Sequence, residues 1–93
     1  MALSNHTRIA LKYALKSSDI GDEVADVIDA GSGTLSAAAR ERMEVLVADR
    51  IVGDSICDKI DAGSALSGRE QDYLGIMLTN RVAATEIATE LSS

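Results

Sequence analysis

One sequence unit occurs three times in this chain, and this repetition restricts the possible folds more than any other feature. The copies begin at Leu3, Leu35 and Leu66, at offsets of 32 and 31 residues. The best matching columns are Leu3/Leu35/Leu66, Ser4/Ser36/Ser67, Leu11/Met43/Leu74, Leu15/Val47/Leu78, Val24/Ile56/Ile87 and Ile28/Ile60/Leu91. A period of this length indicates a small supersecondary unit that buries its apolar face against its neighbours. We expect one domain, residues 1–93, made of three repeats, 3–34, 35–65 and 66–93.

Each unit is expected to start with a helix. Ser4, Ser36 and Ser67 precede apolar residues at i, i+3 and i+4 spacing, and serine is a favoured N-cap residue. Glu70 stands three residues after Ser67, which fits a capping box. This pattern predicts helices over residues 5–16, 37–48 and 68–79.

A second helix should follow in each unit. Ser17, Asp49 and Asn80 occupy one column and can all cap a helix N-terminus. The later column of Asp22, Asp54 and Thr85 offers alternative caps, but apolar residues spaced by four favour the earlier start. Gly31 and Gly63 are expected to end the second helices of the first two units.

The predicted fold is all-α: six short helices as three tandem αα-hairpin repeats, in a compact bundle or a short solenoid. The chain has no Pro, Phe or Trp, so Leu, Ile, Val, Met and Ala must form its core. Gly21 and Gly53 share a column near the start of the second helix. They predict either a close helix crossing or a position in the turn. The third unit loses the Asp-Ala-Gly-Ser of residues 29–32 and 61–64, which favours a terminal capping unit.

Charge and hydropathy limit the possible partners. The net charge of −6 argues against nucleic-acid binding, because phosphate contacts need clustered Lys and Arg, and it favours a basic or neutral protein partner. No apolar run reaches membrane-spanning length, and the N-terminus lacks the apolar core of a signal peptide. We expect a protein made in a cytoplasm, without membrane binding.

Five residues are candidates for a partner contact. Asp26 and Asp29, repeated as Asp58 and Asp61, place carboxylates near helix C-termini, where the helix dipole disfavours negative charge. They fit either a contact with a basic partner or a solvated acidic face. Tyr73 is expected to be exposed, and an exposed tyrosine is typical of interface anchors. Tyr13 shares a column with Val45 and Ile76, and we expect it to be half-buried.

No residue pattern indicates catalysis, a metal site or a cofactor. His6 is the one histidine of the chain and should face solvent in a first helical turn. Cys57 shares a column with Ala25 and Ala88 beside a buried stripe, so we expect a small core residue. The Gly-Ser-Gly of residues 31–33 lacks the lysine of a phosphate-binding loop. The segment 29–40 does not fit a calcium loop, because Gly31 and Gly33 stand where oxygen-bearing side chains are needed and no Glu closes it. A non-enzymatic protein is therefore expected.

The repeats, with ALKYAL or MEVLVADR followed by GDEVADVIDAGSGTLS or GDSICDKIDAGSALS, resemble short helical repeats of small accessory proteins of tailed bacteriophages, over residues 3–91. The resemblance implies a virion component that decorates a capsid or tail surface as a homo-oligomer. An alternative is an acidic inhibitor of a host enzyme or defence complex. The expected location is the virion or the host cytoplasm, and the resemblance supplies no catalytic residue.

Overall fold

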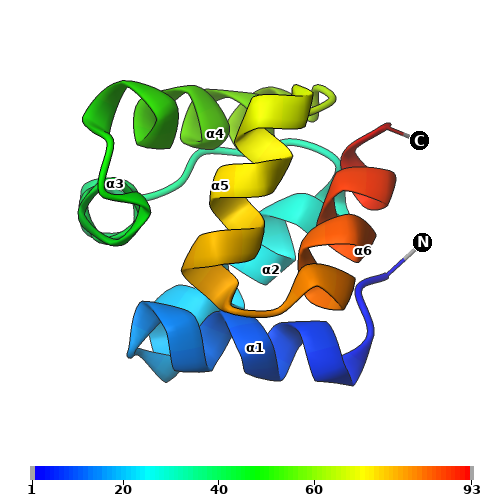
Figure 1. Cartoon of the computed structure of the whole chain (residues 1–93). Coiled ribbons are helices and arrows are strands. Elements are labelled where there is room, and N and C mark those ends of the chain that lie inside the picture. Colours follow the sequence, from blue (N-terminus) through cyan, green and yellow to red (C-terminus); the bar gives the residue numbers. More distant parts are fainter. Residues whose placement is uncertain (1, 93) are drawn as a thin grey trace.

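The computed structural model describes residues 2–92, which form six α-helices and no β-strand (Figure 1). The helices are α1 (Asn5–Leu15), α2 (Ser18–Ala30), α3 (Ala37–Val47), α4 (Arg50–Ala62), α5 (Gly68–Leu78) and α6 (Arg81–Ser92). The predicted all-α class is confirmed. Each predicted first helix extends one residue too far, because the residue after it adopts a left-handed conformation. Within the described range, no helix is both long and apolar enough to cross a membrane.

The predicted N-caps are confirmed for the helices that begin each unit. The hydroxyls of Ser4, Ser36 and Ser67 accept hydrogen bonds from the amides of Thr7, Ala39 and Glu70. Glu70 completes the expected capping box with Ser67.

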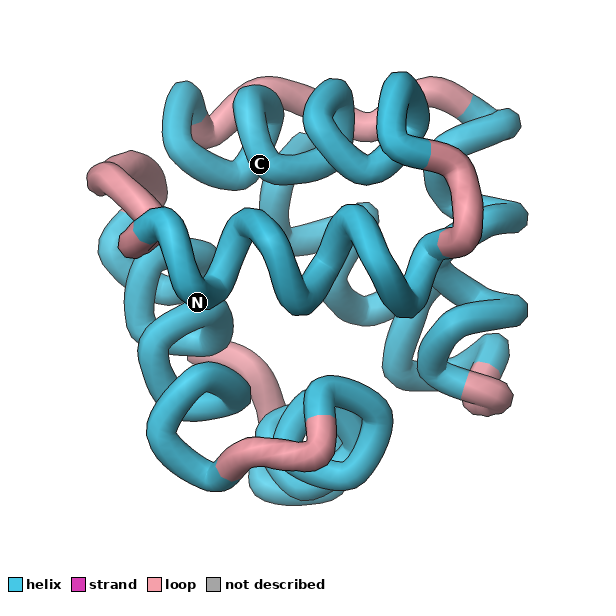
Figure 2. The backbone as a smooth tube through the Cα atoms, turned by 90° about the vertical axis from the view of Figure 1, so that its left-hand side faces the viewer, coloured by secondary structure: helices cyan, strands magenta, loops and turns pink. Residues whose placement is uncertain are grey.

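The earlier of the two predicted starts is correct for the second helices. Ser17 accepts from Ile20 N, Asp49 accepts from Ile51 N and Val52 N, and Asn80 accepts from Ala83 N. Each of these helices therefore starts within three residues of the end of the preceding one, which leaves very short turns (Figure 2).

The helices close into a globule instead of an open stack. Consecutive helices of each unit contact one another, and the second helix of each unit contacts the first helix of the next: α2 with α3, α4 with α5, and α6 with α1. In Figure 1, α1 runs across the view, α5 runs upright and α3 is seen end-on, and these three helices touch pairwise. The molecule measures 28 × 26 × 25 Å, which fits a compact bundle and not a solenoid.

The core is aliphatic, as the composition predicts. Apolar side chains from all six helices are fully buried, including Leu11, Ile28, Met43, Ile56 and Ile87. The three leucines that open the units are also buried, at 3–6% exposure. The linkers that precede the first helices are therefore anchored by apolar contacts.

The glycines of the second helices mark close helix crossings. A Cβ on Gly21 would lie 2.7 Å from Lys12 Cα, and one on Gly53 would lie 2.8 Å from Glu44 Cα. In the third unit the column of Lys12 and Glu44 holds Gly75, which faces Ala84. In the third unit the glycine is therefore on the first helix of the pair, and the two helices still approach closely. Gly21 and Gly53 lie within α2 and α4, so the interpretation that they belong to the turn is wrong.

Carboxylates join neighbouring units. Glu23 of α2 accepts hydrogen bonds from the N–H and hydroxyl of Ser36, at 2.6 and 3.0 Å. Glu86 of α6 accepts the equivalent pair from Ser4. The hydrogen bonds from Ser4 lower the pKa of Glu86. The last unit is thereby linked to the first.

At the junction of the second and third units, the carboxylate comes from the later unit instead of the earlier one. Ser55 of α4 occupies the column of the other two carboxylates, and Glu70 of α5 reaches back to it. Glu70 also accepts hydrogen bonds from Ser67 N at 2.7 Å and Lys59 Nζ at 2.6 Å. The expectation of a terminal capping unit is wrong, because α6 packs on α1 and leaves no terminal face.

Candidate interaction surface

The repeated aspartates Asp29 and Asp61 join the two ends of the first and second units. Their carboxylates accept hydrogen bonds from Leu3 N at 2.7 Å and Leu35 N at 2.9 Å. Each also pairs with an arginine of the preceding helix, at 3.0 and 3.2 Å. Their side chains are 22% and 23% exposed. The unfavourable position near a helix C-terminus is offset by these contacts within the chain.

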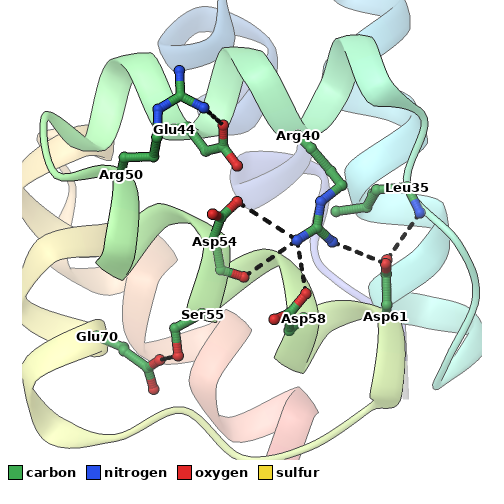
Figure 3. A network of polar contacts seen from close by, with 9 residues as sticks. All are labelled: Leu35, Arg40, Glu44, Arg50, Asp54, Ser55, Asp58, Asp61 and Glu70. Carbon is green, nitrogen blue, oxygen red and sulfur yellow. Dashed lines mark hydrogen bonds and ion pairs between the residues drawn. The ribbon is translucent and has the colours of Figure 1, made fainter.

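The other two predicted contacts, Asp26 and Asp58, lie at the surface but are also paired. Asp26 contacts Arg8, and Asp58 lies 2.7 Å from Arg40 (Figure 3). The hydrogen bond from Arg40 to Asp58 raises the pKa of that arginine. The carboxylates thus bind basic groups of their own chain, and a partner contact at these residues stays a prediction.

The expectations for the two tyrosines are wrong. Tyr73 is half-buried, packs against the core and lies under the Arg69 guanidinium at 5.7 Å from the ring centroid. Tyr13 is 82% exposed. Val45 and Ile76, its equivalents in the other units, are 62% and 73% exposed. This column projects apolar side chains into solvent in every unit, so Tyr13 is the stronger contact candidate.

The buried polar groups have structural partners. Burial of Glu70 opposes its ionisation, yet hydrogen bonds from Lys59, Ser55 and Ser67 outweigh this effect and lower its pKa to about 2. Cys57 is fully buried, as predicted, and burial raises the pKa of its thiol to about 11. Among residues 2–92, no three His, Cys, Asp or Glu side chains form a group that could hold a metal ion.

One surface depression, which we call the α1 groove, lies between α1 and the α5–α6 turn. It has a volume of about 260 Å³ and is lined by His6, Ile9, Ala10, Tyr13, Leu78, Thr79 and Asn80. Asn80 Nδ2 lies 3.0 Å from His6 Nε2 at one end of the groove. An amide nitrogen of this kind donates, so Nε2 of a neutral His6 accepts.

Apolar side chains border the α1 groove in contact with solvent. Ile9 is 49% exposed, and Tyr13 stands one helical turn further along the same face. Such a pair beside a depression is typical of a protein-binding surface. This surface could not be predicted from local sequence patterns, because the groove joins α1 to residues more than sixty positions away.

A second depression, the α3 groove, is the equivalent feature one unit later. Its volume is about 310 Å³, and Ala38, Glu41, Arg42, Val45 and Ile20 line it. The four α3 residues occupy the columns of His6, Ile9, Ala10 and Tyr13. The same architecture therefore carries different side chains in the two grooves.

Comparison with known proteins adds no relative. The chain matches no protein-family model, no curated protein and no solved structure.

Proposed function

We propose that this chain is a non-enzymatic docking protein that binds a protein partner through the apolar surface beside the α1 groove. The observation that carries the proposal is the pair Tyr13 and Ile9, large apolar side chains that project into solvent next to a depression. An exposed aromatic next to a pocket supplies buried apolar area and shape complementarity when a partner covers it. The buried ionisable groups are engaged in contacts within the chain, which gives catalysis no support.

The resemblance to accessory proteins of tailed bacteriophages implies a partner on a capsid or tail surface, and we propose this partner class. On such a lattice a small domain gains strength from many copies, so a modest contact at each site suffices. Contacts between copies, as in a homo-oligomer, belong to the same proposal. The expected location is the virion.

No specific observation supports the alternative hypothesis of an acidic inhibitor. Such an inhibitor would present its acidic helix faces to a basic, nucleic-acid-binding surface of the host protein, and it therefore needs carboxylates that are free to meet that surface. Here Asp22 pairs with Lys12 at 3.2 Å, Asp72 pairs with Arg81 at 3.0 Å, and Arg40 lies among three aspartates (Figure 3).

The test is quantitative mass spectrometry of gradient-purified particles from infected cells, comparing this chain with the major capsid protein. We expect a fixed, high ratio for the native chain and a large loss for Tyr13→Asp. Ile51→Asp is the matched control, because Ile51 is also 82% exposed but lies on α4, away from the α1 groove. Absence of the native chain from particles would refute the virion role, and equal loss in both variants would refute docking through α1.

A further inference from the structure

At two of the three unit junctions the column of Ala10 carries a long side chain. In the α3 groove, Arg42 projects from the column of Ala10 and donates a hydrogen bond from Nη1 to Leu15 O at 2.6 Å. Leu15 ends α1, and its carbonyl is one of the helix-terminal groups that lack an intrahelical partner. A guanidinium therefore satisfies the end of the helix while its stem lies on apolar surface.

At the next junction the same column holds Tyr73. Its ring is half-buried against the core, and the Arg69 guanidinium lies over it at 5.7 Å. This column thus carries a long side chain with a planar end group in the second and third units, Arg42 and Tyr73. In the third unit the guanidinium of Arg69 lies over the Tyr73 ring.

The α1 groove differs because the column holds Ala10, whose side chain is too short to reach the carbonyl at the end of the neighbouring helix. The acceptor equivalent to Leu15 O is Leu78 O, at the end of α5. Thr79 Oγ1 donates to this carbonyl at 2.7 Å, and a carbonyl oxygen can accept a second hydrogen bond. Tyr13 adds an aromatic face where the α3 groove has Val45.

Charge does not oppose a cationic occupant. The residues that line the α1 groove include no Lys or Arg that would repel a guanidinium. The chain as a whole carries a net charge of −6, which attracts a cation at long range.

We propose that the α1 groove binds an arginine side chain of a partner protein, with the guanidinium donating to Leu78 O and lying against the Tyr13 ring. The partner's arginine would take the position in the α1 groove that Arg42, a residue of this chain, takes in the α3 groove. This inference rests on the proposed docking function and gives the chemistry of the partner at that site.

The experiment is an NMR titration of the ¹⁵N-labelled chain with the capped peptide acetyl-Gly-Arg-Gly-amide, using the lysine analogue as a probe of equal charge. We expect saturable shifts at Ile9, Tyr13 and Asn80, and binding of the arginine peptide about threefold or more tighter than that of the lysine peptide. Equal affinities, or shifts outside the α1 groove, would overturn the proposal, as would tighter binding of acetyl-Gly-Tyr-Gly-amide.

Two variants use the repeat as an internal control. Ala10→Arg should fill the α1 groove from within and abolish the shifts, while a native-like spectrum reports that the variant is folded. Arg42→Ala should free Leu15 O in the α3 groove and add a second set of shifts around Val45. Unchanged binding by the Ala10→Arg variant would overturn the proposal. If this variant instead dissociates a homo-oligomer, the occupant is a second copy and a separate partner is excluded.

Failure of this inference can be distinguished from failure of the docking function. If native particles carry the chain and Tyr13→Asp removes it, docking stands whatever the peptide does. If Ala10→Arg then leaves the particle ratio unchanged, the partner does not insert an arginine into the groove, and the inference is wrong by itself.

Discussion

Substitution of one residue on α4 and one on α5 should move the carboxylate of one junction without loss of the fold. Glu70 and Ser55 form the junction of the second and third units, where the carboxylate comes from the first helix of the later unit. At the preceding junction it comes from Glu23 of the earlier unit, opposite Ala39. The double variant Ser55→Glu, Glu70→Ala therefore copies a junction that the chain already contains.

The magnitudes follow from the contacts of Glu70. The Glu70→Ala variant loses hydrogen bonds from Lys59 and from the N–H of Ser67, and a hydrogen bond to a charged group contributes roughly 1.5–3 kcal/mol. Lys59 is 33% exposed and can turn to water, so we expect a net cost of about 2–4 kcal/mol. The Ser55→Glu variant should cost about 2 kcal/mol, because it places a second carboxylate beside Glu70.

The double variant should be more stable than Glu70→Ala, which gives a coupling energy of about 2 kcal/mol or more. Urea denaturation followed by far-ultraviolet circular dichroism measures all four free energies of unfolding. Glu41→Ala, an exposed helical carboxylate change, is the control and should alter stability by less than about 0.5 kcal/mol. If the losses of unfolding free energy in the two single variants simply add in the double variant, the two junctions are not equivalent and the reasoning is refuted.

Four further predictions concern stability and reactivity. The low pKa of Glu70, about 2 against an ordinary 4.5, contributes roughly 3 kcal/mol of stability that is complete above pH 4.5 and disappears as the pH falls through 2; acid denaturation of native and Glu70→Gln chains should differ in that window. The Gly53→Ala variant should lose about 1–3 kcal/mol by overpacking and melt earlier, whereas Gly68→Ala, with open space around it, should not. The Ala48→Gly variant should gain about 1 kcal/mol in urea denaturation, since Ala48 has φ of 64°. Cys57, with a thiol pKa raised to about 11, should react with a thiol reagent far more slowly in the native than in the urea-unfolded chain.

Helix positions could be predicted from sequence because their determinants are local. A serine N-cap acts on an amide three residues away, and apolar spacing within one helix identifies the buried stripe. The repeat strengthened each assignment, since Ser17, Asp49 and Asn80 differ in identity but share capping chemistry. These elements needed no knowledge of the tertiary structure.

The roles of the aspartates and tyrosines could not be predicted because their partners are distant in sequence. Asp29 bonds to Leu3 N across 26 positions, so its placement at a helix C-terminus was interpreted without the contact that explains it. The column of Tyr13, Val45 and Ile76 was assigned to a half-buried face because all three residues are apolar. Apolar character does not establish burial, and here the column is exposed in every unit.

Closure of the three units changes how their differences are interpreted. In an open stack, divergence of the last unit reflects a terminal face that must meet water. Here α6 packs on α1, so each unit has two neighbours and equivalent positions meet equivalent surroundings. Ala10 thus stands in the column where Arg42 reaches a helix-terminal carbonyl and Tyr73 packs against the core at the other junctions. Since no terminal role explains this difference, the surface beside Ala10 is the position at which the proposed side chain of a partner would replace the missing contact.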